Sequence, residues 1–139
     1  MRAVIDTNVH VSALMGTGPP ARIMADWQDE QTFELVICPS LIREISDVCS
    51  RPHIARRLPR AVVRNYLLAV NDKAAGMPDP AQIAAVTRDS GDDYLIALAR
   101  SANSDFIVSG DKDLLEWPEQ QPPVVTPAEF EDLLNVEAV

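Results

Sequence analysis

The sequence is poor in cysteine, in long apolar runs and in positive charge. Its two cysteines, Cys38 and Cys49, have no zinc-binding spacing and its two histidines stand alone, so we expect no zinc site and two reduced, structural thiols. No run of about 18 apolar residues exists, and an apolar strand pattern begins at residue 2, which leaves no room for a signal peptide. We therefore expect a soluble, cytoplasmic protein with no membrane segment.

Positive charge is scarce, because 12 Lys and Arg residues face 21 Asp and Glu residues and give a net charge of −9. Nucleic-acid affinity depends largely on clustered Lys and Arg, so this balance argues against a nucleic-acid partner. The distribution weakens that argument: six of the twelve basic residues fall within positions 43–64, while positions 89–119 hold eight acids. If these acids lie close together in space, they repel one another, and a bound cation would relieve that repulsion. The alternative is that they form a solvated acidic surface.

The length and apolar content, 139 residues and 47%, suit one domain with a proper core. We expect a single domain over residues 1–139, with no internal repeat or linker. Apolar runs of strand length alternate with helical patterns, and the runs lie at 2–8, 33–38, 105–110 and 122–125. This alternation predicts an α/β fold with three layers, αβα, around a central, mostly parallel sheet of four to five strands.

Helical patterns fill the intervals between these runs. They lie at 9–14, 21–30, 40–49, 51–75, 92–100 and 126–134, with the segment at 80–87 ambiguous. Pro52 and Pro59 break the helical segment at 51–75, which carries several arginines and an apolar stripe that begins at Val62. Thr126 and Glu129 have the spacing of a capping box and predict the start of the last helix.

Acidic residues follow the predicted strands. Asp6 ends the first strand, Asp111 follows the third, and Glu44 and Asp93 lie in the first turns of two helices. Each has an ordinary explanation, since Asp6 or Thr7 can cap a helix and Glu44 can stabilise a helix dipole. Ligands of open parallel sheets bind beyond the carboxyl ends of the strands. If the strands are neighbours, the acids converge in one crevice and favour Mg²⁺ or Mn²⁺, which prefer oxygen ligands.

Four motifs, taken in order, resemble the PIN domain, a nuclease family related in fold to the flap and 5′-nucleases, and in particular its VapC-like bacterial toxins. The motifs are Val4-Ile5-Asp6-Thr7-Asn8, Glu44 after the second strand, Asp93-Tyr-Leu-Ile96-Ala97, and Val108-Ser109-Gly-Asp111-Lys-Asp113-Leu114. Residues 125–130 resemble the last strand and helix of the family, so the resemblance covers essentially the whole chain.

The resemblance implies a metal-dependent ribonuclease whose acidic residues bind Mg²⁺ or Mn²⁺ and leave products with a 5′-phosphate and a 3′-hydroxyl. By it, the catalytic and metal-binding positions are Asp6, Glu44, Asp93 and Asp111, supported by Asn8, Ser109 and Asp113. Asp92 competes with Asp93 for one of these positions. The spacing to Ile96-Ala97 favours Asp93 and leaves Asp92 as the cap of its helix.

The partners follow from the same resemblance. RNA is the expected substrate, with Arg56, Arg57 and Arg60 contacting its phosphates, although these arginines also suit an ordinary exposed helical face. A toxin of this type implies an antitoxin protein and a homo-oligomer.

Three other functions compete with the ribonuclease. A phosphatase with an aspartate nucleophile needs a second Asp two residues after Asp6, where this chain has Asn8. A receiver-like Mg²⁺-binding signalling domain needs an acid pair after the first strand, where only Asp6 is present. A PIN fold that binds without cleaving is the third alternative, and the intact acids disfavour it.

Overall fold

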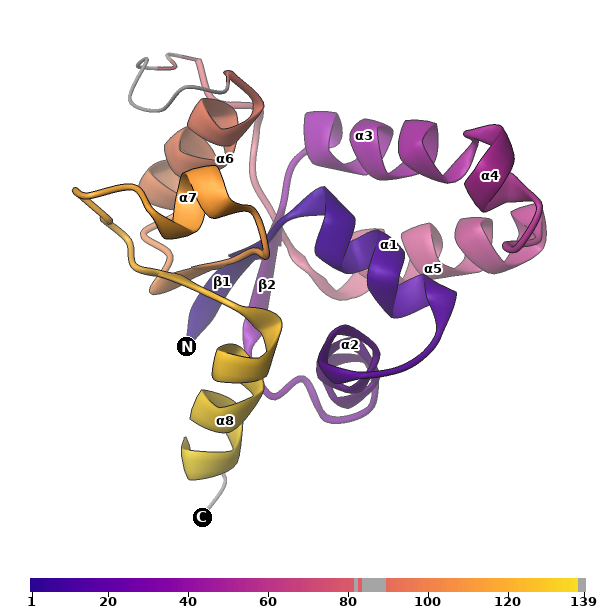
Figure 1. Ribbon diagram of the computed structural model, residues 1–139, viewed down its shortest axis with the longest axis horizontal. Coiled ribbons are helices and arrows are strands. Elements are labelled where there is room, and N and C mark those ends of the chain that lie inside the picture. Colours follow the sequence, from indigo (N-terminus) through magenta and orange to yellow (C-terminus); the bar gives the residue numbers. More distant parts are fainter. Residues whose placement is uncertain (82, 84–89, 138–139) are drawn as a thin grey trace.

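The computed structural model describes residues 1–81, 83 and 90–137. They form a five-stranded parallel sheet, and helices lie on both sides of its strands (Figure 1). The strands are β1 (Arg2–Ile5), β2 (Glu34–Ile37), β3 (Ala75–Gly76), β4 (Phe106–Val108) and β5 (Val124–Val125). Their order is β3-β2-β1-β4-β5, and all four pairings are parallel. The predicted α/β class, three-layer arrangement and parallel sheet are confirmed.

Helices connect and cover the strands. They are α1 (Thr7–Met15), α2 (Pro19–Glu30), α3 (Pro39–Cys49), α4 (Pro52–Ala55), α5 (Arg60–Lys73), α6 (Ser90–Ser101), α7 (Lys112–Leu115) and α8 (Pro127–Glu137). Four of them begin at a proline, which suits the first helical position because its missing N–H would have no partner there. None of these helices, as far as the chain is described, is long and apolar enough to cross a bilayer.

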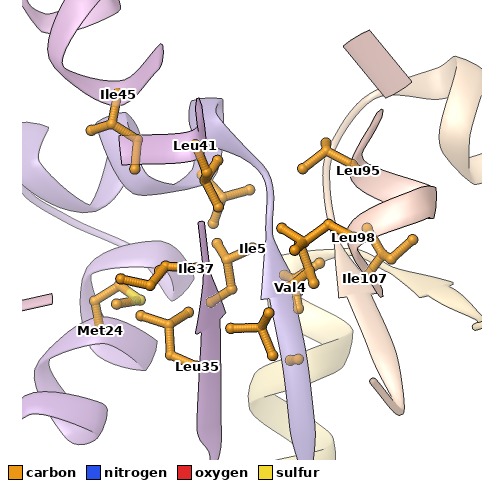
Figure 2. Close-up of a cluster of buried hydrophobic side chains, with 14 of the residues drawn as sticks. Val4, Ile5, Met24, Leu35, Ile37, Leu41, Ile45, Leu95, Leu98 and Ile107 are labelled. Carbon is orange, nitrogen blue, oxygen red and sulfur yellow. The ribbon is translucent and has the colours of Figure 1, made fainter. Parts of the chain in front are cut away.

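The core lies on both faces of the sheet, because successive strand residues point to opposite sides. In Figure 2, Ile5, Leu35 and Ile37 lie on the same side as Met24 of α2 and Leu41 and Ile45 of α3. Val4 and its register partner Ile107 lie on the other side, with Leu95 and Leu98 of α6. All ten labelled side chains are at most 4% exposed, so the central strands are buried on both faces and read as continuous apolar runs.

The C-terminal helix is tied to the sheet by aromatic contacts and a local cap. Phe130 of α8 packs edge-on against Phe33, with ring centroids 5.0 Å apart. The predicted capping box is present, since the Thr126 N–H donates to Glu129 Oε1 at 3.0 Å and the Glu129 N–H donates to Thr126 Oγ1 at 3.2 Å. Arg22 of α2 forms an ion pair with Glu131 at 2.6 Å, which joins α8 to α2.

The strand order places a topological switch between β1 and β4. From β1 the chain passes to β2 and β3 on one side, then crosses to β4 and β5 on the other. Connections leave the carboxyl ends of β1 and β4 toward opposite sides of the sheet, which opens a crevice where ligands bind in folds of this kind. Figure 1 shows α6 and α7 on one side of the strands and α1, α2, α3 and α5 on the other.

The structure corrects several local predictions. β1 ends at Ile5 and α1 begins at Thr7, so Thr7 is the first helical residue and not its cap. The short strand β3 and the helix α7 were not predicted. Val62, placed in the apolar stripe of α5, is 43% exposed. The ambiguous segment at 80–87 falls mostly outside the described residues, and both cysteines are free and buried, as expected.

Candidate active site

Asp6 lies at the carboxyl end of the central strand, directly at the switch point. It is 8% exposed, and its N–H donates to the Val108 carbonyl at 2.9 Å, which continues the pairing of β1 with β4. Its Oδ2 accepts a hydrogen bond from Ser109 Oγ at 2.8 Å. Burial raises the pKa of the Asp6 carboxyl, the Ser109 hydrogen bond opposes that effect, and the charges of Glu44 and Asp111 raise it further.

Ser109 connects Asp6 to the acids that follow β4. While its hydroxyl donates to Asp6, it accepts the N–H of Asp111 at 3.0 Å. Asp111 then caps α7, because its Oδ1 accepts the Asp113 N–H at 2.9 Å. Two short-range bonds therefore fix the turn after β4, and the first of them is made by Ser109, which is completely buried.

Three carboxylates converge beside this turn. Asp92, Asp111 and Asp113 each offer an oxygen atom, and these three oxygens all lie within 4.8 Å of one another. Asp92 is 5% exposed, while Asp111 and Asp113 are partly buried. Asp92 comes from α6, Asp111 is the cap of α7 and Asp113 lies in the first turn of α7, so the cluster joins two helices that are far apart in the sequence.

The cluster contains Asp92, whereas the sequence favoured Asp93 for this position. The helix α6 begins at Ser90, so Asp92 lies within its first turn and is not the predicted cap. Successive residues of a helix point about 100° apart, so neighbouring acids on α6 cannot face the same partner equally. Asp93 is also 5% exposed but lies outside the three-carboxylate cluster. The structure therefore brings Asp92 to the other two carboxylates, and the assignment of a catalytic role to Asp93 stays a prediction.

Glu44 and Asn8 affect Asp6 differently, Glu44 through its charge and Asn8 through its backbone. Glu44 is an exposed residue of α3, outside the three-carboxylate cluster, but its charge raises the pKa of Asp6. Asn8 is exposed, and its backbone N–H lowers the pKa of Asp6 by a hydrogen bond, in addition to the larger effect of Ser109. Of the predicted polar supports, Ser109 therefore contacts Asp6 through its side chain, while Asn8 acts on it through its backbone.

A sequence model of the PIN domain matches residues 2–113, which run from the start of β1 to Asp113. The chain belongs to the PIN-domain family. PIN domains are typically metal-dependent nucleases, and every acid of the crevice lies within the matched range.

Two known proteins resemble this PIN domain. The uncharacterized protein MJ1680 of Methanocaldococcus jannaschii is 30% identical over 116 residues, which cover 83% of this chain and 74% of that protein. The crystal structure of PAE2754 from Pyrobaculum aerophilum has a TM-score of 0.68 and 17% identity, and the match covers 98% of this chain and 90% of that one. At this identity the second likeness shows the fold alone.

The donors of this PIN domain suit a hard divalent cation. Asp92, Asp111 and Asp113 offer only carboxylate oxygens, which Mg²⁺ and Mn²⁺ prefer. Ligand oxygens on Mg²⁺ are about 3 Å apart when neighbours and about 4.2 Å apart when opposite, so oxygens within 4.8 Å of one another can bind it together after side-chain movements of at most about 2 Å. His10 is no ligand candidate here, because it is completely buried and its Nδ1 is bonded to Tyr66 Oη at 2.6 Å.

A tyrosine that the sequence did not single out lies on the α3 side of the crevice. The Tyr94 hydroxyl is 2.9 Å from the Sγ of Cys38, the residue between β2 and α3. Burial raises the pKa of Tyr94 well above its usual value, and the Cys38 thiol and the charges of Glu44 and Asp79 raise it further. Tyr94 is therefore a neutral group close to the acids. Its partner is 56 residues away in the chain, so no local pattern could have revealed the contact.

The arginines lie away from the acidic cluster. Arg56, Arg57 and Arg60 are all exposed at the α4–α5 end of the molecule, which Figure 1 shows at the opposite end of α3 from α6. A groove of about 940 Å³ lies there, between α3, α4 and α5. Apolar side chains form most of its lining together with Arg60 and Arg64, and none of the predicted acids lines it. The arginines therefore lie at a distance from the acids, on a different part of the molecule.

Proposed function

We propose that this PIN domain is a Mg²⁺- or Mn²⁺-dependent ribonuclease that hydrolyses RNA phosphodiester bonds. The observation that supports this most strongly is the convergence of Asp92, Asp111 and Asp113 within 4.8 Å at the switch point of the sheet. A bound Mg²⁺ or Mn²⁺ would polarise the scissile phosphate and supply an activated water for in-line attack.

Each acid has a part in this proposal. Asp92, Asp111 and Asp113 would hold the cation, with Asp6 and Glu44 completing the set of oxygen ligands from the β1 and α3 side. Asp6 is the most constrained of these, because Ser109 fixes one of its oxygens at 2.8 Å. Asp92 takes the role that the sequence gave to Asp93.

The arginines complete the proposal with a substrate contact. Arg56, Arg57 and Arg60 would bind RNA phosphates by charge, without reading sequence, and would offset the repulsion expected of a protein with a net charge of −9. Because they lie beyond α3, the phosphates that they contact would be several nucleotides from the cleaved bond.

A more specific role within this proposal is that of the toxin in a toxin–antitoxin pair. That role entails an antitoxin partner and a homo-oligomer. Family membership supports it. The receiver-like alternative loses its support, because the family is now known and because receiver sheets have the order 2-1-3-4-5, in contrast to the order found here. A growth arrest on expression in a bacterial host that Asp111→Asn abolishes is the expected result for a toxin.

The direct test of the ribonuclease is cleavage of end-labelled single-stranded RNA with Mn²⁺, with Mg²⁺ and with EDTA. Asn at position 111 can still cap α7 but lacks the charge, so Asp111→Asn should keep its fold and lose on the order of 100-fold or more in rate. Asp132→Asn, at an exposed position of α8, is the matched control and should cleave like wild type. Metal-independent cleavage, or full activity of Asp111→Asn, would contradict the proposal.

A further inference from the structure

Tyr94 forms a side-chain hydrogen bond across the crevice, from α6 to the junction of β2 and α3. Its hydroxyl lies 2.9 Å from Cys38 Sγ, and Cys38 is 2% exposed. On the other side of β1, Ser109 Oγ bonds to Asp6 across β4 and β1. The acidic crevice at the end of β1 thus has the Tyr94–Cys38 bond on its β2 side and the Ser109–Asp6 bond on its β4 side.

Tyr94 and Asp92 lie on the same turn of α6 but point in different directions. A helix turns by about 200° over two residues, so the side chains of Asp92 and Tyr94 project to nearly opposite sides of α6. Asp92 faces Asp111 and Asp113, and Tyr94 faces Cys38. Any rotation or shift of this turn that breaks the Tyr94 contact therefore also moves Asp92 relative to the other two carboxylates.

We propose that Tyr94 is a positioning residue for the metal site, whose bond to Cys38 holds the first turn of α6 at the correct distance from Glu44 of α3. This inference rests on the proposed function, because it concerns the same acidic crevice. The bond anchors α6 to a residue that is held by the core, so it fixes Asp92 before any cation is bound. Such preorganisation increases metal affinity without adding a ligand.

The test is Mn²⁺ affinity by isothermal titration calorimetry of the full chain. Tyr94→Phe removes only the hydroxyl and should weaken Mn²⁺ binding about 10-fold, the lower end of the effect usual for groups that orient metal ligands. Cys38→Ala should weaken it similarly, and Cys38→Ser, which keeps a hydrogen-bonding side chain, should restore most of the affinity. The double variant Tyr94→Phe with Cys38→Ala should be no worse than either single variant, because both remove one bond.

Tyr66→Phe is the matched control. It also removes a phenolic hydroxyl with a short hydrogen bond, to His10 Nδ1 at 2.6 Å, but it lies on α5, which carries none of the proposed metal ligands. It should lower the thermal midpoint while leaving the Mn²⁺ dissociation constant within twofold of wild type. Tyr94→Phe should also recover the wild-type kcat for RNA cleavage at saturating Mn²⁺, because its defect lies in affinity.

Two results would overturn the inference. An Mn²⁺ dissociation constant of Tyr94→Phe within twofold of wild type, with or without a loss of thermal stability, would show a purely structural hydroxyl and leave the proposed function intact. Absence of Mn²⁺ binding by the wild-type chain at millimolar concentrations would remove the metal site itself, and the role of Tyr94 with it.

Discussion

Exchanging Asp92 and Asp93 separately for Asn is the sharpest test of how the acidic cluster is built. Asn keeps nearly the volume of Asp but cannot supply the negative charge that a divalent cation requires. The two positions are adjacent and equally buried, at 5% exposure, so each variant is a control for the other. Of these two described residues, Asp92 has an oxygen within 4.8 Å of both Asp111 and Asp113, whereas Asp93 is outside that group.

The magnitude follows from the charges. Two full charges 4.8 Å apart repel by about 3.5 kcal/mol at an effective dielectric near 20. Solvent screening reduces this, so Asp92→Asn should leave the metal-free protein as stable as wild type or stabilise it by on the order of 1 kcal/mol. A cation present at 100 times its dissociation constant stabilises the folded state by about 2.7 kcal/mol. For a chain of this length that raises the thermal midpoint by roughly 10 °C.

The assay is thermal unfolding with and without Mn²⁺, followed by RNA cleavage. Wild type and Asp93→Asn should show the full metal-dependent rise, and Asp92→Asn should show little or none of it, with cleavage lost in parallel. A full rise in Asp92→Asn together with its loss in Asp93→Asn would refute the reasoning and return the site to the assignment made from sequence.

Two further predictions concern groups outside the cluster. Burial lowers the pKa of His10 to about 4 from its usual 6.5, so the unfolded chain binds more protons between these values and stability falls as pH drops from about 6.5 to 4. The free energy of unfolding should fall by about 3 kcal/mol over this pH range. Urea unfolding at several pH values should show a weaker pH dependence of stability for His10→Gln than for wild type. The same pH dependence in both proteins would contradict this prediction. Replacing Arg56, Arg57 and Arg60 together with Ala should weaken RNA binding and reduce the slope of log affinity against log salt by about 2, without loss of stability, in a binding titration. An unchanged slope would mean an ordinary solvated surface.

The features predicted correctly from sequence are those with local causes. Thr126 and Glu129 are three residues apart and form their capping box wherever a helix follows them. Pro52 and Pro59 lie at the breaks between helices, at the start of α4 and directly before α5, because a proline has a fixed ring geometry and no N–H. The apolar runs around Val4 and Leu35 became central strands, since few other elements can bury such runs on both faces.

The features that the sequence did not reveal depend on distant partners. Ala75–Gly76 has no strand pattern of its own and is extended only because it pairs with β2. Val62 has the spacing of a core residue but is largely exposed. Helical periodicity shows which residues share a face of the helix, but it does not show whether another element packs on that face. Which of Asp92 and Asp93 lies beside Asp111 and Asp113 depends on how α6 packs beside α7, and this packing has no local sequence pattern.

The Ser109 to Asp6 bond joins residues 103 positions apart, which has a consequence for synthesis of the chain. On a translating ribosome, Asp6 and Glu44 leave the exit tunnel long before Ser109, Asp111 and Asp113 have been added. The N-terminal strands β1, β2 and β3 can pair during that time, but the edge of β1 that receives β4 stays open. A nascent chain that ends before β4 therefore holds only part of the acidic group, and the group is complete only after β4 and α7 have left the ribosome.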